Sequence, residues 1–182
     1  MDLPAAVRYH LPVMSATLPE RVDAGRMVEA RRQFRGALPV ASLNRLREAL
    51  ADARGLVEYE LEFGRDALGV PFVAVRARAG LNLQCQRTLD VFEHPLDVDV
   101  RLGVIGHERE EAALPPGYEP LLVEDGVLEP AKVIEDELLL ALPAFPVKPG
   151  SESPGDGQEV EQVSRREDNP FAILRELKKE QR

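Results

Sequence analysis

Apolar and polar residues alternate along the middle of the chain, in the pattern that strands with one buried face produce. From Val57 to Phe63 every second residue is apolar, and the residues between them are glutamates. Similar runs follow at 70–77, 81–85 and 96–102, with glycines between the first three runs. Because the connections are short, we predict about four strands in an antiparallel meander, with a turn or register change between Gln86 and Pro95.

Three further segments have the spacing and the residue types of helices. Residues 42–50 place leucines three and four positions apart behind Ser42, a candidate N-cap. Residues 131–142 align three aliphatic side chains on one side before a proline stops the helix, and residues 19–34 are rich in helix formers. A short strand at 121–123 leads into a turn. The expected fold class is α+β, a mostly antiparallel sheet with flanking helices.

The C-terminal part differs in composition. Residues 146–168 are rich in Pro, Gly, Ser and Glu and hold hardly any aliphatic residue, so we expect a disordered acidic linker. Beyond it, Asn169 and Pro170 suit the cap and the first position of a helix that carries Phe171 and Leu174 on one face. The predicted organisation is an α+β domain at 1–145, the linker at 146–168 and a C-terminal amphipathic docking helix at 169–182.

Charge is distributed unevenly along the chain. The net charge is −9 over 182 residues, yet residues 108–161 hold 14 acidic and 3 basic residues, and the remainder is slightly basic. An overall negative charge argues against a broad, sequence-independent grip on nucleic acid, which depends on Lys and Arg contacts to phosphate. The acidic segment fits either a basic partner, such as a ribosomal protein, or an ordinary solvated surface that keeps the protein in solution.

Composition also bears on location. No apolar run approaches the roughly 18 residues that a membrane span needs, and the first residues lack the basic start and unbroken apolar core of a secretory signal. A single cysteine excludes an internal disulfide framework. We therefore expect a cytoplasmic protein without a membrane span.

The motifs of common enzymes are missing: the sequence contains no nucleophile elbow, phosphate-binding loop, dinucleotide fingerprint or HExxH. Cys85 is the only cysteine and has no paired ligand at zinc-knuckle spacing, so no metal or other cofactor is expected. Since Cys85 continues the apolar side of the run 81–85, a buried core cysteine is the preferred interpretation. The alternative is a nucleophile paired with His94, which lies in the same hairpin.

Two charged groups are candidates for binding. The consecutive acids Glu135, Asp136 and Glu137 lie in the predicted helix at 131–142, where adjacent side chains point apart. They suit a solvated helix surface, or contact with a basic partner, better than acid–base catalysis. Basic residues gather at 31–35, and Arg87 and two other arginines of the strand region are candidate RNA contacts, although an ordinary charged surface is the preferred interpretation.

Several motifs occur together in one order. They are the turn Cys85-Gln86-Arg87-Thr88, the segment 114–120, the acidic helix 134–143 that ends in Ala-Leu-Pro, and the terminal Asn-Pro-Phe-Ala-Ile-Leu at 169–174. In this order they resemble the YceD family of large ribosomal RNA subunit accumulation proteins. The resemblance implies a cytoplasmic, non-enzymatic bacterial factor in the synthesis, processing or stability of 23S ribosomal RNA, with large-subunit rRNA or a basic ribosomal protein as partner.

One position departs from the family pattern. Members of the family usually carry cysteine at both ends of the turn, whereas Thr88 stands at the second position here. A zinc site or a redox pair of the kind that two cysteines form is therefore not expected in this chain.

The leading hypothesis is a factor that acts by binding rRNA or a ribosomal protein. Its rivals are a cysteine-dependent hydrolase or nuclease that uses Cys85 and His94, and a protein-interaction adaptor that never touches RNA. The candidate binding residues are Cys85, Arg87, Glu135, Asp136, Asn169, Pro170, Phe171 and Leu174.

Overall fold

The structure is a computed structural model, in which residues 18–151 are described. The lead-in at 1–17 and the candidate residues Asn169, Pro170, Phe171 and Leu174 lie outside the described residues. The chain divides into two compact units, 1–148 and 149–182, and the first contains all the described helices and strands. The part of the predicted linker beyond residue 151 and the C-terminal docking helix stay predictions.

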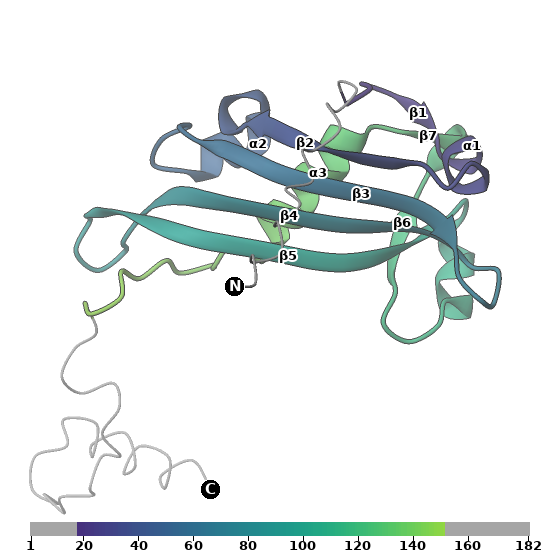
Figure 1. The fold of residues 1–182 in the computed structure, drawn as a ribbon. Helices are drawn as coiled ribbons and strands as arrows, with labels where there is room; N and C mark the ends of the chain where they lie inside the picture. The colour runs from purple at the N-terminus through teal and green to yellow at the C-terminus, as the bar shows by residue number, and fades with distance from the viewer. Residues whose placement is uncertain (1–17, 152–182) are drawn as a thin grey trace, which may run out of the picture. The chain divides into compact units, whose positions relative to one another are not determined.

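A five-stranded sheet in the order β2-β3-β4-β5-β6 forms the centre of the first unit (Figure 1). The first four strands are antiparallel neighbours, and β6 runs parallel to the end of β5. The predicted α+β class and the antiparallel meander are therefore confirmed. The strands are β2 Gln33–Pro39, β3 Leu56–Arg65, β4 Pro71–Gln84, β5 Val91–Ile105 and β6 Glu119–Leu122.

The alternating pattern identified one face of the sheet correctly. In β3 the apolar residues from Val57 to Phe63 are buried. The predicted runs 70–77 and 81–85 are a single strand, because the ladder with β5 continues through Gly80, which lies opposite Pro95. Gly80 does not break the strand; a Cβ there would clash with the Glu93 side chain.

The helix predicted at 19–34 is mostly wrong. Only α1, Ala24–Glu29, is helical, and it follows the short strand β1, Val22–Asp23. Arg31 adopts a left-handed conformation with φ of 46° just beyond the helix, and the chain then enters β2. Phe34 is drawn into this strand because its ring packs edge-on against Phe63, at 6.0 Å between ring centroids. Tertiary burial overrides the helix propensity of the segment.

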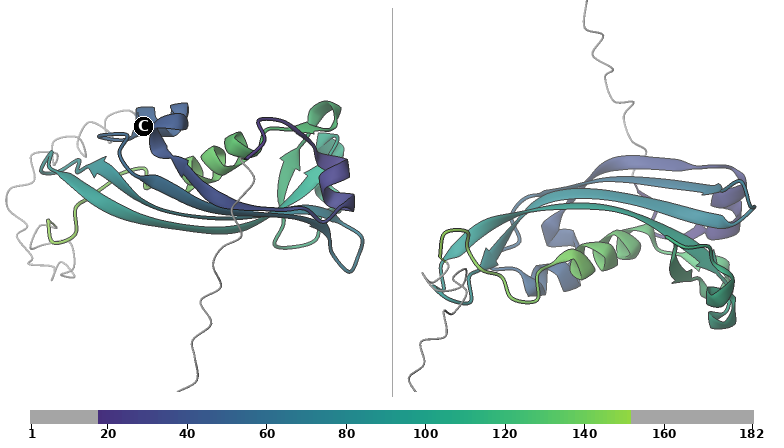
Figure 2. Two further views of the ribbon diagram at one scale, coloured as in Figure 1. Left: turned by 45° about the horizontal axis from the view of Figure 1, so that its top comes forward. Right: turned by 90° about the horizontal axis from the view of Figure 1, so that it is seen from below.

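The other two predicted helices are present as α2, Asn44–Ala49, and α3, Pro130–Ala141. Ser42 is not an N-cap; its hydroxyl donates to the Pro39 carbonyl at 2.6 Å within the 3₁₀ turn η1, Val40–Ser42. Figure 2 shows the helices on one side of the sheet, which bends around α3. The core lies between these layers and includes Leu46 and Leu138, both fully buried.

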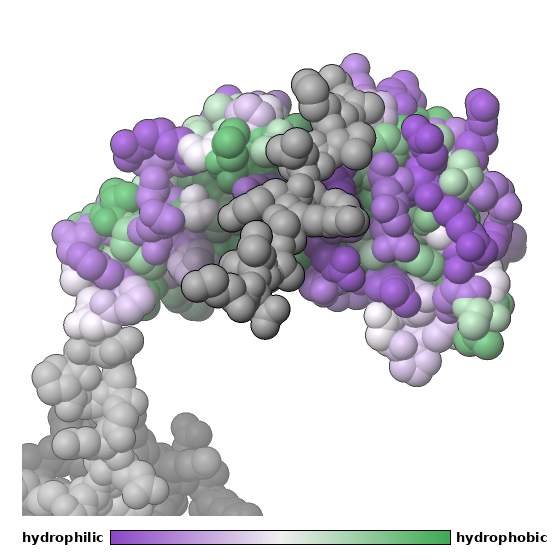
Figure 3. Space-filling model, in the orientation of Figure 1, coloured by the Kyte–Doolittle hydropathy of each residue, from purple (hydrophilic) through white to green (hydrophobic). Residues whose placement is uncertain are grey.

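The opposite face of the sheet carries charged side chains in rows across the strands. Arg76 of β4 lies between Glu60 and Asp99, and the neighbouring Arg78 pairs with Asp97 at 3.1 Å. Figure 3 views this face and shows hydrophilic side chains over much of it. Exposed pairs of this kind contribute only about 0–1 kcal/mol each. They make the face mixed in charge rather than basic.

The remaining elements close one end of the unit. The 3₁₀ turns η2, Glu108–Ala113, and η3, Glu124–Gly126, flank β6, and β7, Val127–Leu128, pairs with β1. The predicted strand at 121–123 overlaps β6, and the predicted turn after it is η3. None of the described helices has the length and apolar content that a membrane span requires.

Candidate functional site

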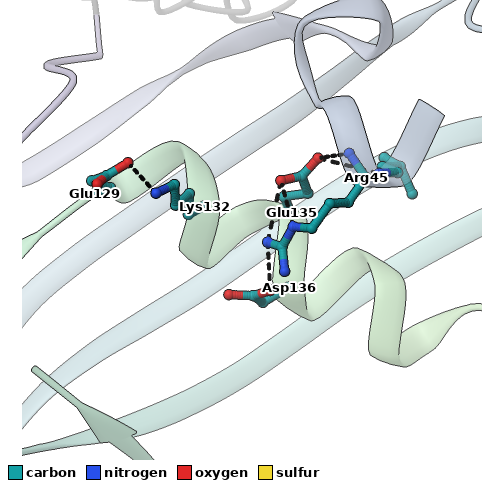
Figure 4. A network of polar contacts seen from close by, with 6 residues as sticks. Arg45, Glu129, Lys132, Glu135 and Asp136 are labelled. Atoms are coloured by element: carbon teal, nitrogen blue, oxygen red, sulfur yellow. Dashed lines mark hydrogen bonds and ion pairs between the residues drawn. The ribbon is translucent and has the colours of Figure 1, made fainter. Parts of the chain in front are cut away.

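The carboxylate of Glu135 lies at the N-terminus of α2 (Figure 4). Its Oε1 accepts hydrogen bonds from the backbone N–H groups of Arg45 at 2.7 Å and Leu46 at 3.2 Å. The residue in the N-cap position of α2, Leu43, offers no side-chain acceptor. The first turn of a helix leaves its N–H groups without partners, so Glu135 of α3 supplies the cap that the local sequence lacks.

Arg45 joins the same carboxylate to its neighbour in the sequence. Its guanidinium donates to Glu135 Oε2 at 3.2 Å and contacts Asp136 Oδ1 at 2.6 Å. The hydrogen bond to Asp136 is the main cause that raises the pKa of Arg45 above its ordinary value. The Glu129–Lys132 pair, at 2.8 Å, is a separate contact within the first turn of α3 (Figure 4). The network therefore fastens α2 to α3.

The interpretation of the acidic trio as a solvated surface is wrong for two of its members. Glu135 and Glu137 are 6% and 8% exposed, whereas the side chain of Asp136 is half exposed. The sequence did contain a signal: Glu137 follows the buried Val133 by four positions and Ile134 by three, so it lies on the buried side of the helix. Arg45 carried no signal in the sequence, because no local pattern links it to a residue ninety positions away.

Glu137 differs from Glu135 in having no partner in the part of the chain that the structure describes. No hydrogen bond or ion pair joins it to any residue of the described range 18–151. Burial raises the pKa of its carboxyl group, and the nearby negative charges of Glu119 and Asp136 raise the pKa further. The fold thus keeps a carboxylate in a place that disfavours its charge.

The Cys85 turn is ordered around the sulfur. Cys85 is fully buried, as predicted, and its Sγ accepts hydrogen bonds from the backbone N–H groups of Thr88 and Lys148, both at 3.4 Å. These donors stabilise a thiolate, and they lower the pKa of Cys85 to about 6, with the Lys148 bond as the largest cause. The sulfur is therefore an acceptor that fixes a turn as well as a buried apolar group.

The same turn receives the chain that follows α3. The N–H of Gln86 donates to the carbonyl of Pro146 at 2.9 Å, next to the Lys148 contact. Leu89 adopts a left-handed φ of 62°, and its N–H closes the turn on the Cys85 carbonyl. Arg87 is exposed in this turn, beyond the ends of β4 and β5. The residues that follow α3 are thus held against the Cys85 turn by backbone hydrogen bonds.

The structure does not bring Cys85 and His94 together. His94 lies opposite Leu81 in the ladder, and Leu81 precedes Cys85 by four positions. At about 3.3 Å per residue this separation is roughly 13 Å along the strand. A cysteine–histidine pair within hydrogen-bond reach, as nucleophilic catalysis needs, is therefore not formed. Within residues 18–151 no group of three or more His, Cys, Asp or Glu side chains is placed to hold a metal ion.

The basic candidates separate into different places. Arg31 and Arg32 are exposed in the turn after α1, and Arg35 pairs with Glu60 on β3. Arg76 and Arg78 lie side by side on the charged face, where acidic partners already contact them. Arg87 lies at the hairpin end instead of joining them. No continuous basic platform results in the described part of the chain.

Comparison with known proteins places the chain in a family. The model of the family described as large ribosomal RNA subunit accumulation protein YceD matches residues 73–178, more than half of the chain. The chain belongs to the YceD family. A protein of Haemophilus influenzae described as large ribosomal RNA subunit accumulation protein YceD is 26% identical over 167 residues, which cover 88% of this chain and 96% of the relative. No solved structure matches the chain.

The matched YceD region contains the features built from β4 onward. It starts at Val73 and includes the Cys85 turn and all of α3. Arg45 and α2 precede it, so the matched region carries the carboxylate that caps α2 but not the helix that is capped. The family resemblance inferred from the turn, the acidic helix and the terminal segment is confirmed.

Replacing Glu135 tests the cap. Glu135→Ala removes the acceptor for two backbone N–H groups and leaves Arg45 with only Asp136, so we expect the free energy of unfolding to fall by about 2 kcal/mol. The measurement is denaturant unfolding followed by circular dichroism.

A control on the same helix is Glu129→Ala. The side chain of Glu129 is 37% exposed and, among the described residues, pairs only with Lys132. A change below about 0.5 kcal/mol is expected there. Equal losses in the two variants would contradict the assignment of Glu135 as a cap.

Cys85 gives a prediction for the pH dependence of stability. The pKa of Cys85 in the folded protein is about 6, below the ordinary thiol value of about 8.5. The thiolate therefore contributes its full stabilisation of the fold above about pH 8.5. The contribution declines as the pH falls and is lost near the folded pKa. We expect the difference in Tm between the wild type and Cys85→Ala to be larger at about pH 8.5 than at about pH 5.5. A difference independent of pH would show that the sulfur acts only by packing.

Proposed function

We propose that this YceD-family protein promotes the accumulation of large-subunit ribosomal RNA and that it does so by binding. Membership of the family is the observation that carries the proposal. The description of the Haemophilus influenzae relative as a large ribosomal RNA subunit accumulation protein, 96% of which aligns with this chain, supports the same role. Because bacterial ribosomal RNA is made and assembled in the cytoplasm, the role implies that the protein works there.

Two features of the described residues support binding over catalysis. Cys85 is enclosed by its own turn and lies far from His94, which leaves the cysteine-dependent hydrolase without a base. Glu135 and Asp136, two of the three acidic residues considered for acid–base work, contact Arg45 and the amides of α2. Cys85, Glu135 and Asp136 are thus used to hold the fold, and the role proposed here is non-enzymatic.

The charge of the chain favours a protein partner within the assembling subunit. The net charge is −9, and the arginines of the sheet face are matched by acidic neighbours. Ribosomal RNA would be repelled by most of this surface, whereas a basic ribosomal protein would be attracted to it. Direct RNA contact has local support at Arg31 and Arg32, which are exposed, and at Arg87 in the hairpin turn.

Deleting the gene tests the proposed role. We expect a lower ratio of mature 23S to 16S ribosomal RNA and fewer complete large subunits in sucrose gradients. The defect should be larger during slow growth in the cold, when assembly is slowest. The wild-type gene supplied on a plasmid is the control, and it should restore the ratio. An unchanged ratio and an unchanged subunit profile under both conditions would refute the role.

Crosslinking in cells separates the two kinds of partner. A photoreactive residue placed at Arg87, or at Arg31, should crosslink to ribosomal RNA if the protein contacts RNA directly. From the net charge we expect crosslinks mainly to ribosomal proteins. A matched probe at Glu108, which is exposed in the acidic η2 turn, measures background contacts. Dominant RNA crosslinks at the arginine positions would favour direct RNA binding instead.

A further inference from the structure

Most of β5 is an open edge of the sheet. The strand runs from Val91 to Ile105, but β6 pairs only with the stretch from Leu102 onward. In Figure 1 β5 is the lowest of the long strands, and β6 lies beside its end only. No other strand of the described range pairs with residues 91–101 on that side. The open part is about 30 Å long at roughly 3.3 Å per residue.

The register shows which backbone groups face outward along this edge. The carbonyl of Asp90 accepts from Cys85 and so points to β4, whereas the carbonyl of Ile105 points away and accepts from Val123. Because backbone groups alternate along a strand, the odd-numbered residues of β5 present their groups to the open side. Pro95 lacks an N–H, but Asp97 and Asp99 each offer both a donor and an acceptor. The edge can therefore pair with an added strand.

Two carboxylates that have no partner among residues 18–151 lie beside this edge, on the side of the sheet that α3 covers. Glu119 of β6 pairs in register with the buried Leu102, so its side chain points to the same face. Glu137 of α3 is 8% exposed and without a partner in the described range. No enclosed polar side-chain atom of that range lacks a hydrogen bond, so the Glu137 oxygens must still touch solvent.

An apolar contact is available next to the carboxylates. Leu140 lies three positions after Glu137, on the same side of α3, and it is 75% exposed. A long basic side chain combines an apolar stem with a cationic end, so it matches an exposed leucine next to two carboxylates. On the opposite face of the same edge, Asp97 and Asp99 provide further negative charge, although arginines of β4 contact both.

We propose that the open edge of β5, together with Glu119 and Glu137, is a docking surface for an extended, basic segment of a protein partner. The segment adds a strand beside β5, and one of its Lys or Arg side chains reaches the two carboxylates. The proposal rests on the proposed function, since it specifies how a basic ribosomal protein would be bound. A second copy of this chain fits poorly, because its net charge of −9 would meet a surface of the same sign.

The buried charge gives the surface a property that can be measured. Burial disfavours the Glu137 carboxylate in the free protein, and a bound cation would remove that penalty. Since the folded pKa is raised, the penalty is present at neutral pH and disappears as the pH falls through the folded pKa. Glu137→Gln should therefore raise the Tm of the free protein at neutral pH while it weakens the complex. Glu135→Ala, on the same helix, should lower the Tm.

The binding experiment uses the full-length protein and synthetic peptides of about ten residues that tile the Lys- and Arg-rich tails of large-subunit ribosomal proteins. At least one peptide should bind in fluorescence anisotropy, and Glu137→Gln should weaken it about tenfold or more. Glu108→Gln removes an equal charge from an exposed site and should change the affinity less than about twofold. Hydrogen exchange at the amides of Asp97 and Asp99 should slow in the complex.

The proposal would be overturned if no basic peptide binds, or if Glu137→Gln leaves the affinity for the peptides unchanged. It would also be overturned if Glu137→Gln weakens binding to fragments of 23S RNA but to no peptide. Gene deletion and complementation in cells distinguish a failure of the proposed docking surface from a failure of the proposed function. If deletion lowers the 23S ratio and the Glu137→Gln gene restores it fully, the docking surface is wrong and the function stands. If deletion leaves the ratio unchanged, the proposed function itself fails.

Discussion

The carboxylate of Glu135 is the contact on which the helical layer depends. A six-residue helix such as α2 is too short to be stable by itself, and its first amides need acceptors. A buried carboxylate in turn needs donors, because an isolated charge is costly in the interior. The two requirements satisfy one another only when α3 crosses the sheet beside α2. Arg45 then spans Glu135 and Asp136 and fixes the two helices together.

Glu135 and Glu137 are alike in chemistry and burial, yet they have opposite consequences. Glu135 accepts four hydrogen bonds and stabilises the packing of α2 on α3. Glu137 accepts none within the described residues, and its ionisation is opposed by burial. A protein that keeps an unsatisfied charge gives up stability, which is a common property of binding and catalytic sites. The unsatisfied charge of Glu137 lies on the side of α3 that faces β5 and β6.

The sheet is protected in different ways on its faces and its edge. The helices cover one face, and rows of opposite charges make the other face soluble without making it basic. Edge strands attract further strands, and natural proteins limit this with charges and proline. β5 carries Pro95, Asp97 and Asp99 along its open edge. The proline and the two negative charges disfavour pairing with most strands. A basic segment would instead be attracted by the negative charges.

Local pattern determined much of this protein from the sequence alone. Alternation from Val57 to Phe63 identified the buried face of β3, and helical spacing located α3, because periodicity reflects which side of an element leaves water. The turn at Cys85 and the acidic helix also indicated the family. Only the tertiary structure decided that residues 33–34 belong to β2, that the ladder passes through Gly80 and that Glu135 caps α2. These outcomes depend on partners far away in the chain, and no local pattern records which distant group satisfies a buried amide or carboxylate.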